Sequence, residues 1–78
     1  MQTLNLKQLE AFCAVVERGS FTAAAEALYL AQSTVSGHIL ALEKDIGVPL
    51  LVRSGKRRIT LTEEGRRVYD HAHTILQS

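Results

Sequence analysis

The sequence predicts a mainly α-helical domain in which a two-stranded β-hairpin follows three helices and precedes a fourth. Two observations support that prediction. Apolar residues recur at helical spacing in four segments, and residues that favour helix caps or helix ends stand between them. Between the third and fourth segments, two short β-like runs flank a basic turn. The length of 78 residues allows one small domain.

The first two helices are expected to be separated only by Gly19 and Ser20. Asn5 can cap the first helix, with Gln8 positioned to return the bond, and Gly19 ends it. Ser20 can then cap the second helix directly. The expected apolar stripes are Leu6, Leu9, Phe12, Cys13 and Val16 in the first helix and Phe21, Ala24, Ala25 and Leu28 in the second.

A turn formed by residues 29–31 leads into a third helix, expected from about Gln32 to Ile46. We expect Leu30 to point inward and hold the turn. Gly47 and Pro49 end the helix. Apolar residues at i, i+4, i+7 and i+11 predict its buried stripe, which consists of Val35, Ile39, Leu42 and Ile46.

The hairpin is expected to have two strands, Leu50–Arg53 and Arg58–Leu61, joined by residues 54–57. Thr62 can cap the fourth helix, whose first turn is acidic, as the helix dipole favours. Because we expect the first three helices to fill the core, the apolar residues of the fourth helix are left for a partner chain, which favours a homodimer. These residues are Val68, Ala72, Ile75 and Leu76. Ordinary core packing is the alternative for the same residues.

This order of elements is that of a winged helix-turn-helix, a three-helix core with a two-stranded β wing, followed by a linker helix. Its third helix exposes small polar residues where a surface helix usually carries Lys and Glu. Gln32, Ser33 and Thr34 lie near its start; Gln can bond adenine bidentately, and Ser and Thr can bond several base edges. Ser36 and Gly37 follow on the exposed side. The alternative is that the Ser and Thr residues are ordinary surface residues.

The charge distribution gives a second reason to consider nucleic acid. The formal net charge of +1 by itself gives little support. A local basic cluster in the expected hairpin can nevertheless bind phosphate along the backbone or in the minor groove. The cluster consists of Arg53, Lys56, Arg57 and Arg58. Taken alone, it is equally well interpreted as a solvated charged hairpin.

Other classes of protein find little support. The single cysteine, Cys13, allows no internal disulfide and fits a small core residue. No apolar run approaches the roughly 18 residues of a membrane span and no signal peptide is recognisable, so we expect a cytoplasmic protein without membrane contact. His71 and His73 face different directions on a helix and make a poor metal pair. No nucleophile–base–acid set is visible. We therefore expect no enzyme, no metal and no cofactor.

Three blocks resemble the DNA-binding domain of LysR-type transcriptional regulators: GSFTAAAEAL, AQSTVSGHILALEKDIGVPLLVR and RITLTEEG, in this order. The likeness runs from about Leu6 to Leu76. It implies a bacterial transcription factor that binds double-stranded DNA sequence-specifically, as a dimer on an interrupted dyad-symmetric site, with the recognition helix in the major groove. Residues 1–62 would form the winged domain and residues 63–78 would begin the linker and dimerisation helix. A C-terminal domain that binds a small-molecule effector is expected to be absent from this chain.

The resemblance also implies roles for single residues. Thr22 stands in a block where the family tends to meet phosphate, and Arg53 with the turn after it stands where the family places its wing. The positions that correspond to base contacts are Gln32, Ser33, Ser36 and Gly37.

Three departures from the family's pattern bear on binding. Ala31 stands where a capping Ser is usual, which costs about 1 kcal/mol of helix stability unless Ser33, at the usual Pro position, takes over by shifting the start. Gly37 replaces a common Arg and removes a guanine or phosphate contact; a mid-helix glycine also costs roughly 1 kcal/mol. Leu40 stands where a charged residue is usual. We therefore expect a different base preference and a larger share of binding on the wing.

Two alternative functions are open at this point. A winged helix can bind proteins in place of DNA, although the basic hairpin and the polar third helix argue against it. A different family of winged-helix regulators would share DNA binding and lack the dimer formed through the linker helix.

Overall fold

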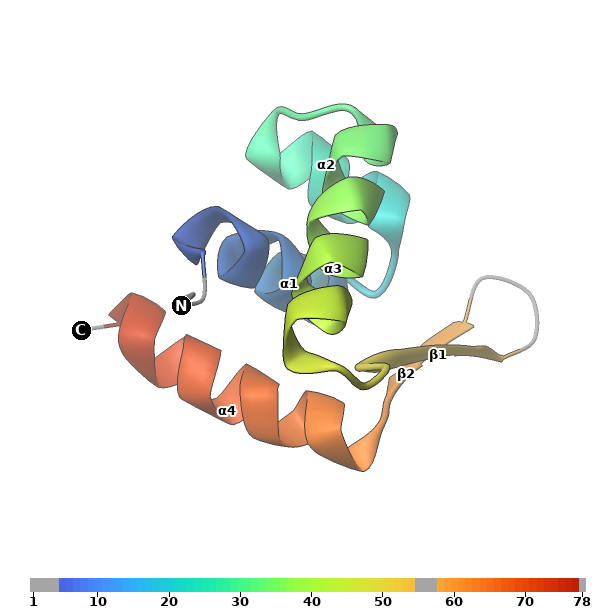
Figure 1. Cartoon of the computed structure of the whole chain (residues 1–78). Helices are drawn as coiled ribbons and strands as arrows, with labels where there is room; N and C mark the ends of the chain where they lie inside the picture. The colour runs from blue at the N-terminus through green and yellow to red at the C-terminus, as the bar shows by residue number, and fades with distance from the viewer. Residues whose placement is uncertain (1–4, 55–57, 78) are drawn as a thin grey trace.

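The computed structural model describes residues 5–54 and 58–77. It has the predicted order of elements, which are α1 (Leu6–Arg18), α2 (Phe21–Leu28), α3 (Gln32–Ile46), β1 (Leu51–Ser54), β2 (Arg58–Leu61) and α4 (Glu63–Gln77). Helices α1, α2 and α3 pack together, the hairpin projects to one side, and α4 runs beneath α1 (Figure 1). The predicted fold, a winged helix-turn-helix followed by a further helix, is confirmed.

The ends of α1 follow the sequence signals with one exception. The Asn5 side chain accepts a hydrogen bond from the Lys7 backbone N–H at 2.8 Å. Gly19 ends the helix with φ +83°, a left-handed conformation that glycine adopts without steric cost. The returning bond predicted for Gln8 is not made, because Oε1 of this half-buried side chain is enclosed and has no hydrogen-bond partner in the described part of the chain.

The turn between α2 and α3 is held by the backbone. Tyr29 adopts the left-handed conformation, with φ +59°, and donates its N–H to the Glu26 carbonyl at 3.3 Å. The Leu30 N–H reaches back to the Ala25 carbonyl at 2.9 Å, which completes a Schellman arrangement. The prediction that Leu30 points inward is wrong, because its side chain is 40% exposed and these two backbone bonds do the holding.

The core is built around α1, which contacts α2, α3 and α4. Its buried residues are Leu9, Ala11, Phe12, Cys13, Val15, Ala24, Ala25, Val35, Ile39, Leu42, Leu50 and Ala72. The buried stripe predicted for α3 is confirmed at Val35, Ile39 and Leu42, with Ile46 partly buried. Leu6, predicted to lie in the stripe of α1, is 56% exposed. Ala11 and Val15 are buried as well, because α1 is covered from more than one side.

The fourth helix contributes to this core, so the premise that the first three helices fill it is wrong. Ala72 is 1% exposed, and Val68 and Tyr69 pack against the core. Ile75 and Leu76 remain 49% and 37% exposed near the end of α4. Whether these residues contact a partner chain stays a prediction. No described helix is long and apolar enough to cross a membrane.

The hairpin pairs Leu51 with Leu61, and the register continues to Ser54 opposite Arg58. Strand β1 begins one residue later than predicted, because Leu50 is fully buried beneath the hairpin and serves as a core residue. The predicted cap of α4 is confirmed: the Thr62 hydroxyl accepts a bond from the Gly65 N–H at 2.9 Å. The same hydroxyl donates to the Pro49 carbonyl at 2.8 Å.

Gly65 allows α4 to approach the start of the hairpin closely. A Cβ atom at this position would collide with the carbonyl oxygen of Leu50, which is backbone and has little freedom to move. The Thr62 N–H donates to that same carbonyl at 3.0 Å. The bonds from Thr62 and the missing side chain of Gly65 therefore fix α4 against the base of the hairpin.

Candidate nucleic-acid interface

The first turn of α3 presents the residues predicted to read bases. Gln32, Ser33 and Thr34 are all exposed, while Val35 directly after them is fully buried and anchors the helix. Helix α3 begins at Gln32, and its N-cap residue Ala31 makes no side-chain capping bond. The suggestion that Ser33 shifts the start of the helix is therefore wrong. The uncapped first turn leaves these polar side chains in solvent.

Thr22 and Gln32 are brought together although they lie in different helices. The Thr22 hydroxyl donates a hydrogen bond to Gln32 Oε1 at 3.1 Å, and both residues are exposed. Thr22 is in the first turn of α2, two residues after the cap formed by Ser20, whose Oγ accepts a bond from the Ala23 N–H at 3.0 Å. The two predicted contact residues therefore form one bonded unit.

Farther along α3, the residues outside the core include Ser36, Gly37 and Leu40. Ser36 is half-buried and lines a shallow depression with Phe21, Leu40 and Leu51. Leu40 is 65% exposed. Gly37 is exposed, and a Cβ built on it meets nothing within 4 Å. Packing therefore does not require glycine at this position.

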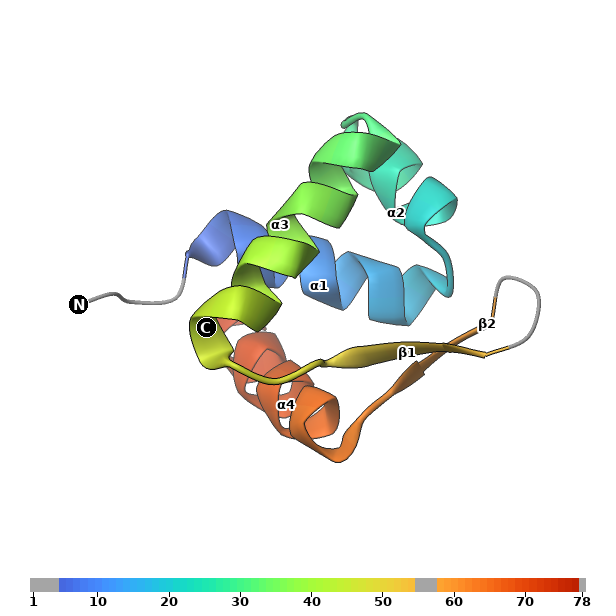
Figure 2. The ribbon, with the colours of Figure 1, turned by 45° about the vertical axis from the view of Figure 1, so that its right-hand side comes forward.

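The predicted basic wing is described in part. Lys56 and Arg57 lie outside the described residues, and for Arg53 and Arg58 the structure describes the backbone only, in paired strands. In two views 45° apart, the hairpin projects toward the side of the molecule where α2 begins, and α4 runs toward the other side (Figures 1 and 2). The hairpin and the start of α2 therefore border the same side of the domain.

Glu43 ties α3 to the hairpin. Its Oε2 atom accepts the backbone N–H groups of Leu50 at 2.7 Å and of Leu51 at 3.2 Å. A carboxylate bonded to two partly buried N–H groups satisfies donors that would otherwise be costly to bury. A bond from a side chain to the backbone of a later segment leaves no periodic signal, so the sequence offered no means of finding it.

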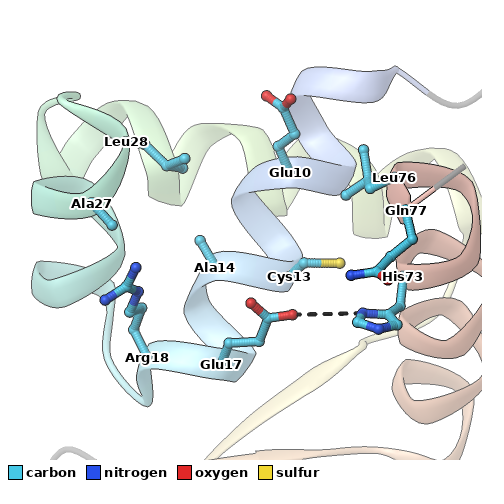
Figure 3. A pocket seen from close by; sticks show the side chains of 10 residues that line it. All are labelled: Glu10, Cys13, Ala14, Glu17, Arg18, Ala27, Leu28, His73, Leu76 and Gln77. Atoms are coloured by element: carbon cyan, nitrogen blue, oxygen red, sulfur yellow. Dashed lines mark ion pairs between the residues drawn. The ribbon is translucent and has the colours of Figure 1, made fainter.

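A second polar cluster joins α4 to α1. The Tyr69 hydroxyl donates to Glu17 Oε2 at 2.8 Å. His73 Nδ1 lies 3.8 Å from the same oxygen, and Figure 3 shows this pair. The hydrogen bond to Glu17, followed by partial burial and the charge of Glu17, raises the pKa of Tyr69 to about 12. The rings of Tyr69 and His73 lie 5.7 Å apart between centroids. This cluster fastens the middle of α4 to the end of α1.

A groove of about 360 Å³ lies beside this cluster, between α1, α2 and the end of α4 (Figure 3). Cys13 lines it, and burial, followed by the charge of Glu17, raises the pKa of that thiol to about 11. None of the described residues that line it comes from α3 or the hairpin, so the groove is separate from the candidate interface. Within residues 5–54 and 58–77, no three His, Cys, Asp or Glu side chains are placed to hold a metal ion.

The family model of lysR-family bacterial regulatory helix-turn-helix proteins matches residues 6–66. The chain is 49% identical over 73 residues to the HTH-type transcriptional regulator PtxR of Pseudomonas aeruginosa. The aligned segment covers 94% of this chain and 23% of PtxR. The chain spans about a quarter of the length of the curated relatives it matches.

Solved structures of DNA complexes are also similar. The CbnR DNA-binding domain in complex with DNA gives a TM-score of 0.87 at 41% identity, covering 94% of this chain and 83% of that chain. The BenM DNA-binding domain in complex with benA site 1 DNA gives a TM-score of 0.87 at 40% identity, covering 94% of this chain and 81% of that chain.

Proposed function

Because the chain belongs to the lysR family of bacterial regulatory helix-turn-helix proteins, we propose that it binds double-stranded DNA at specific sequences as the DNA-binding domain of a transcription regulator. The observation that carries this proposal is the first turn of α3, where exposed Gln32, Ser33 and Thr34 stand on a helix anchored by buried apolar residues. Similar domains of CbnR and BenM have been crystallised with DNA.

In this proposal α3 lies in the major groove. Gln32 carries a carboxamide that can bond adenine through both its oxygen and its nitrogen, and the hydroxyls of Ser33 and Thr34 can bond several base edges. Beyond Ser36 the exposed face offers Gly37 and Leu40, so direct readout is concentrated in the first turn. The basic residues of the hairpin supply contacts with phosphate, along the backbone or in the minor groove; they are Arg53, Lys56, Arg57 and Arg58.

The test is selection of bound sequences from random DNA, followed by binding assays on the selected site and on unrelated DNA. Gln32→Ala should weaken binding to the selected site by about tenfold, since a bidentate base contact contributes roughly 1–3 kcal/mol. Binding to unrelated DNA should be unchanged. Gln77→Ala, at the far end of α4, is the matched control. Absence of binding to any DNA at low salt would overturn the proposal and favour a protein partner.

We extend the proposal to a homodimer formed through the linker helix α4. Supporting it are the exposed apolar side chains of Ile75 and Leu76 near the end of α4. In this proposal residues 63–78 begin the linker helix, and α4, which is their described part, also packs against α1. Sedimentation of Ile75→Ser should show weaker self-association than the parent chain, with Leu40→Ser as the control at an exposed leucine of α3. Unchanged sedimentation of Ile75→Ser over a wide concentration range would contradict the dimer surface.

A further inference from the structure

We propose that Thr22 is a positioning residue for base recognition: its hydroxyl holds the Gln32 carboxamide in the orientation that pairs with a base edge. The inference rests on the proposed function and assigns a specific role to one contact within it. The contact is the hydrogen bond from the Thr22 hydroxyl to Gln32 Oε1, 3.1 Å long, between the first turns of α2 and α3.

The chemistry of the two groups fixes the direction of this bond. A carboxamide oxygen only accepts hydrogen bonds, so the Thr22 hydroxyl must donate its proton to it. The bond turns Oε1 toward α2 and leaves both N–H groups of Nε2 available. Oε1 still has a second lone pair. Gln32 can therefore accept from the N6 amino group of adenine and donate to N7 while it remains bonded to Thr22.

Both ends of the bond stand on well-fixed helices. Thr22 is flanked by the cap at Ser20 and by Ala24, which is fully buried, and a threonine side chain has few χ1 rotamers in a helix. Gln32 directly precedes the segment anchored by Val35. An exposed glutamine that is not held in place loses the conformational entropy of several rotatable bonds when it binds a base. The bond to Thr22 removes part of that loss before DNA arrives.

This role competes with the one that the family resemblance gives to Thr22. A hydroxyl carries a single proton, and phosphate oxygens only accept hydrogen bonds. While Thr22 donates to Gln32, it cannot donate to a phosphate. The two roles predict different losses on substitution. A positioning role affects only the base pair that Gln32 reads, and a phosphate contact affects all DNA equally.

The experiment compares Thr22→Val, which keeps the shape and loses the proton, with Thr22→Ser, which keeps the proton. Each is combined with Gln32→Ala. Dissociation constants are measured for the selected site, for the same site altered at the Gln32-dependent base pair, and for unrelated DNA. Thr22→Val should lower discrimination at that base pair by about three- to tenfold, the size of one net hydrogen bond, and leave unrelated DNA unaffected. Thr22→Ser should retain it.

In the Gln32→Ala background, Thr22→Val should have no further effect. An equal loss on the selected site and on unrelated DNA would overturn the inference in favour of a phosphate contact, and so would additive losses in the double variant. The inference would also be overturned if Thr22→Val discriminated at the Gln32-dependent base pair as well as the parent chain does. If the parent chain shows no sequence preference at all, the proposed function itself fails. Specific binding that depends on Gln32 and is indifferent to Thr22 refutes only the positioning role.

Discussion

The two ends of α3 differ in how they use polar groups. At its start, Ala31 provides no side-chain cap and Gln32, Ser33 and Thr34 are exposed. Near its end, the carboxylate of Glu43 is bonded to two backbone N–H groups of the following segment. The start keeps hydrogen-bonding capacity available for a ligand, at a cost in helix stability, and the end uses it to hold the hairpin. The contacts that stabilise the fold and the residues proposed to bind DNA therefore lie at opposite ends of one helix.

The largest expected effect is at the base of the hairpin, where α4 packs against the segment that follows α3. Gly65→Ala should lower the free energy of unfolding by about 3 kcal/mol, because the new methyl group would collide with the Leu50 carbonyl and backbone must move to relieve it. Chemical denaturation measures the loss. Gly37→Ala, the same substitution at a helical glycine with open surroundings, is the matched control. Equal stability of Gly65→Ala and the parent chain would show that α4 is not held closely against the hairpin.

Glu43→Ala is expected to lower the free energy of unfolding by about 2 kcal/mol, because it leaves the N–H groups of Leu50 and Leu51 without their charged acceptor. Glu43→Gln, which keeps an acceptor oxygen, should recover part of the loss. Hydrogen exchange at these two amides should accelerate in Glu43→Ala. Glu26→Ala, at an exposed carboxylate of α2, controls for loss of charge alone. Unchanged exchange at Leu50 would contradict the role given to Glu43.

A smaller effect, of opposite sign, is expected at Gly37 on the exposed face of α3. Gly37→Ala should raise the free energy of unfolding by roughly 1 kcal/mol, because alanine favours the helix and nothing crowds the position. Gly37→Arg should strengthen binding to DNA of any sequence and increase the salt slope by about one. Thermal unfolding and salt-titrated binding measure the two effects. A destabilised Gly37→Ala would mean that glycine is required at this position after all.

The smallest effect concerns pH and the α1–α4 side. The pKa values of Cys13 and Tyr69 are raised from 9.0 and 10.0 to about 11 and 12. Both groups hold their protons more tightly in the folded chain. Their contribution to stability is therefore complete below pH 9 and is lost as the pH rises toward 12. When the midpoint of thermal unfolding is measured against pH, the midpoint of Tyr69→Phe should fall less steeply with rising pH than that of the parent chain. Tyr29→Phe is the control. Parallel curves for Tyr69→Phe and the parent would refute the contribution of the Glu17 bond.

Much of the fold could be predicted because it rests on local signals. Asn5, Ser20 and Thr62 cap the helices as expected, and the stripe of α3 is buried as its spacing indicates. Predictions failed where tertiary packing decides. Leu6 is exposed, and Ala72 completes the core because α4 docks on α1, an arrangement that the periodicity of a single helix does not encode.

The candidate site was predictable in the same uneven way. The residue types of the first turn of α3 indicated base contacts, and their exposure agrees with that interpretation. The hydrogen bond between Thr22 and Gln32 was not predictable, because it depends on how α2 and α3 pack against each other. The hold of Glu43 on the hairpin depends likewise on where the backbone turns after α3. Such contacts belong to the assembled fold and leave no pattern in the sequence.

The bonds at the base of the hairpin have a practical consequence for protein engineering. Glu43 from one side and Thr62 from the other both bond to residues 49–51, where the first strand begins, so the direction of the hairpin is set at its base. Segments of other length or charge could therefore be grafted between Ser54 and Arg58 as exchangeable cassettes. Variants with altered charge in this segment would then be obtainable without redesigning the scaffold.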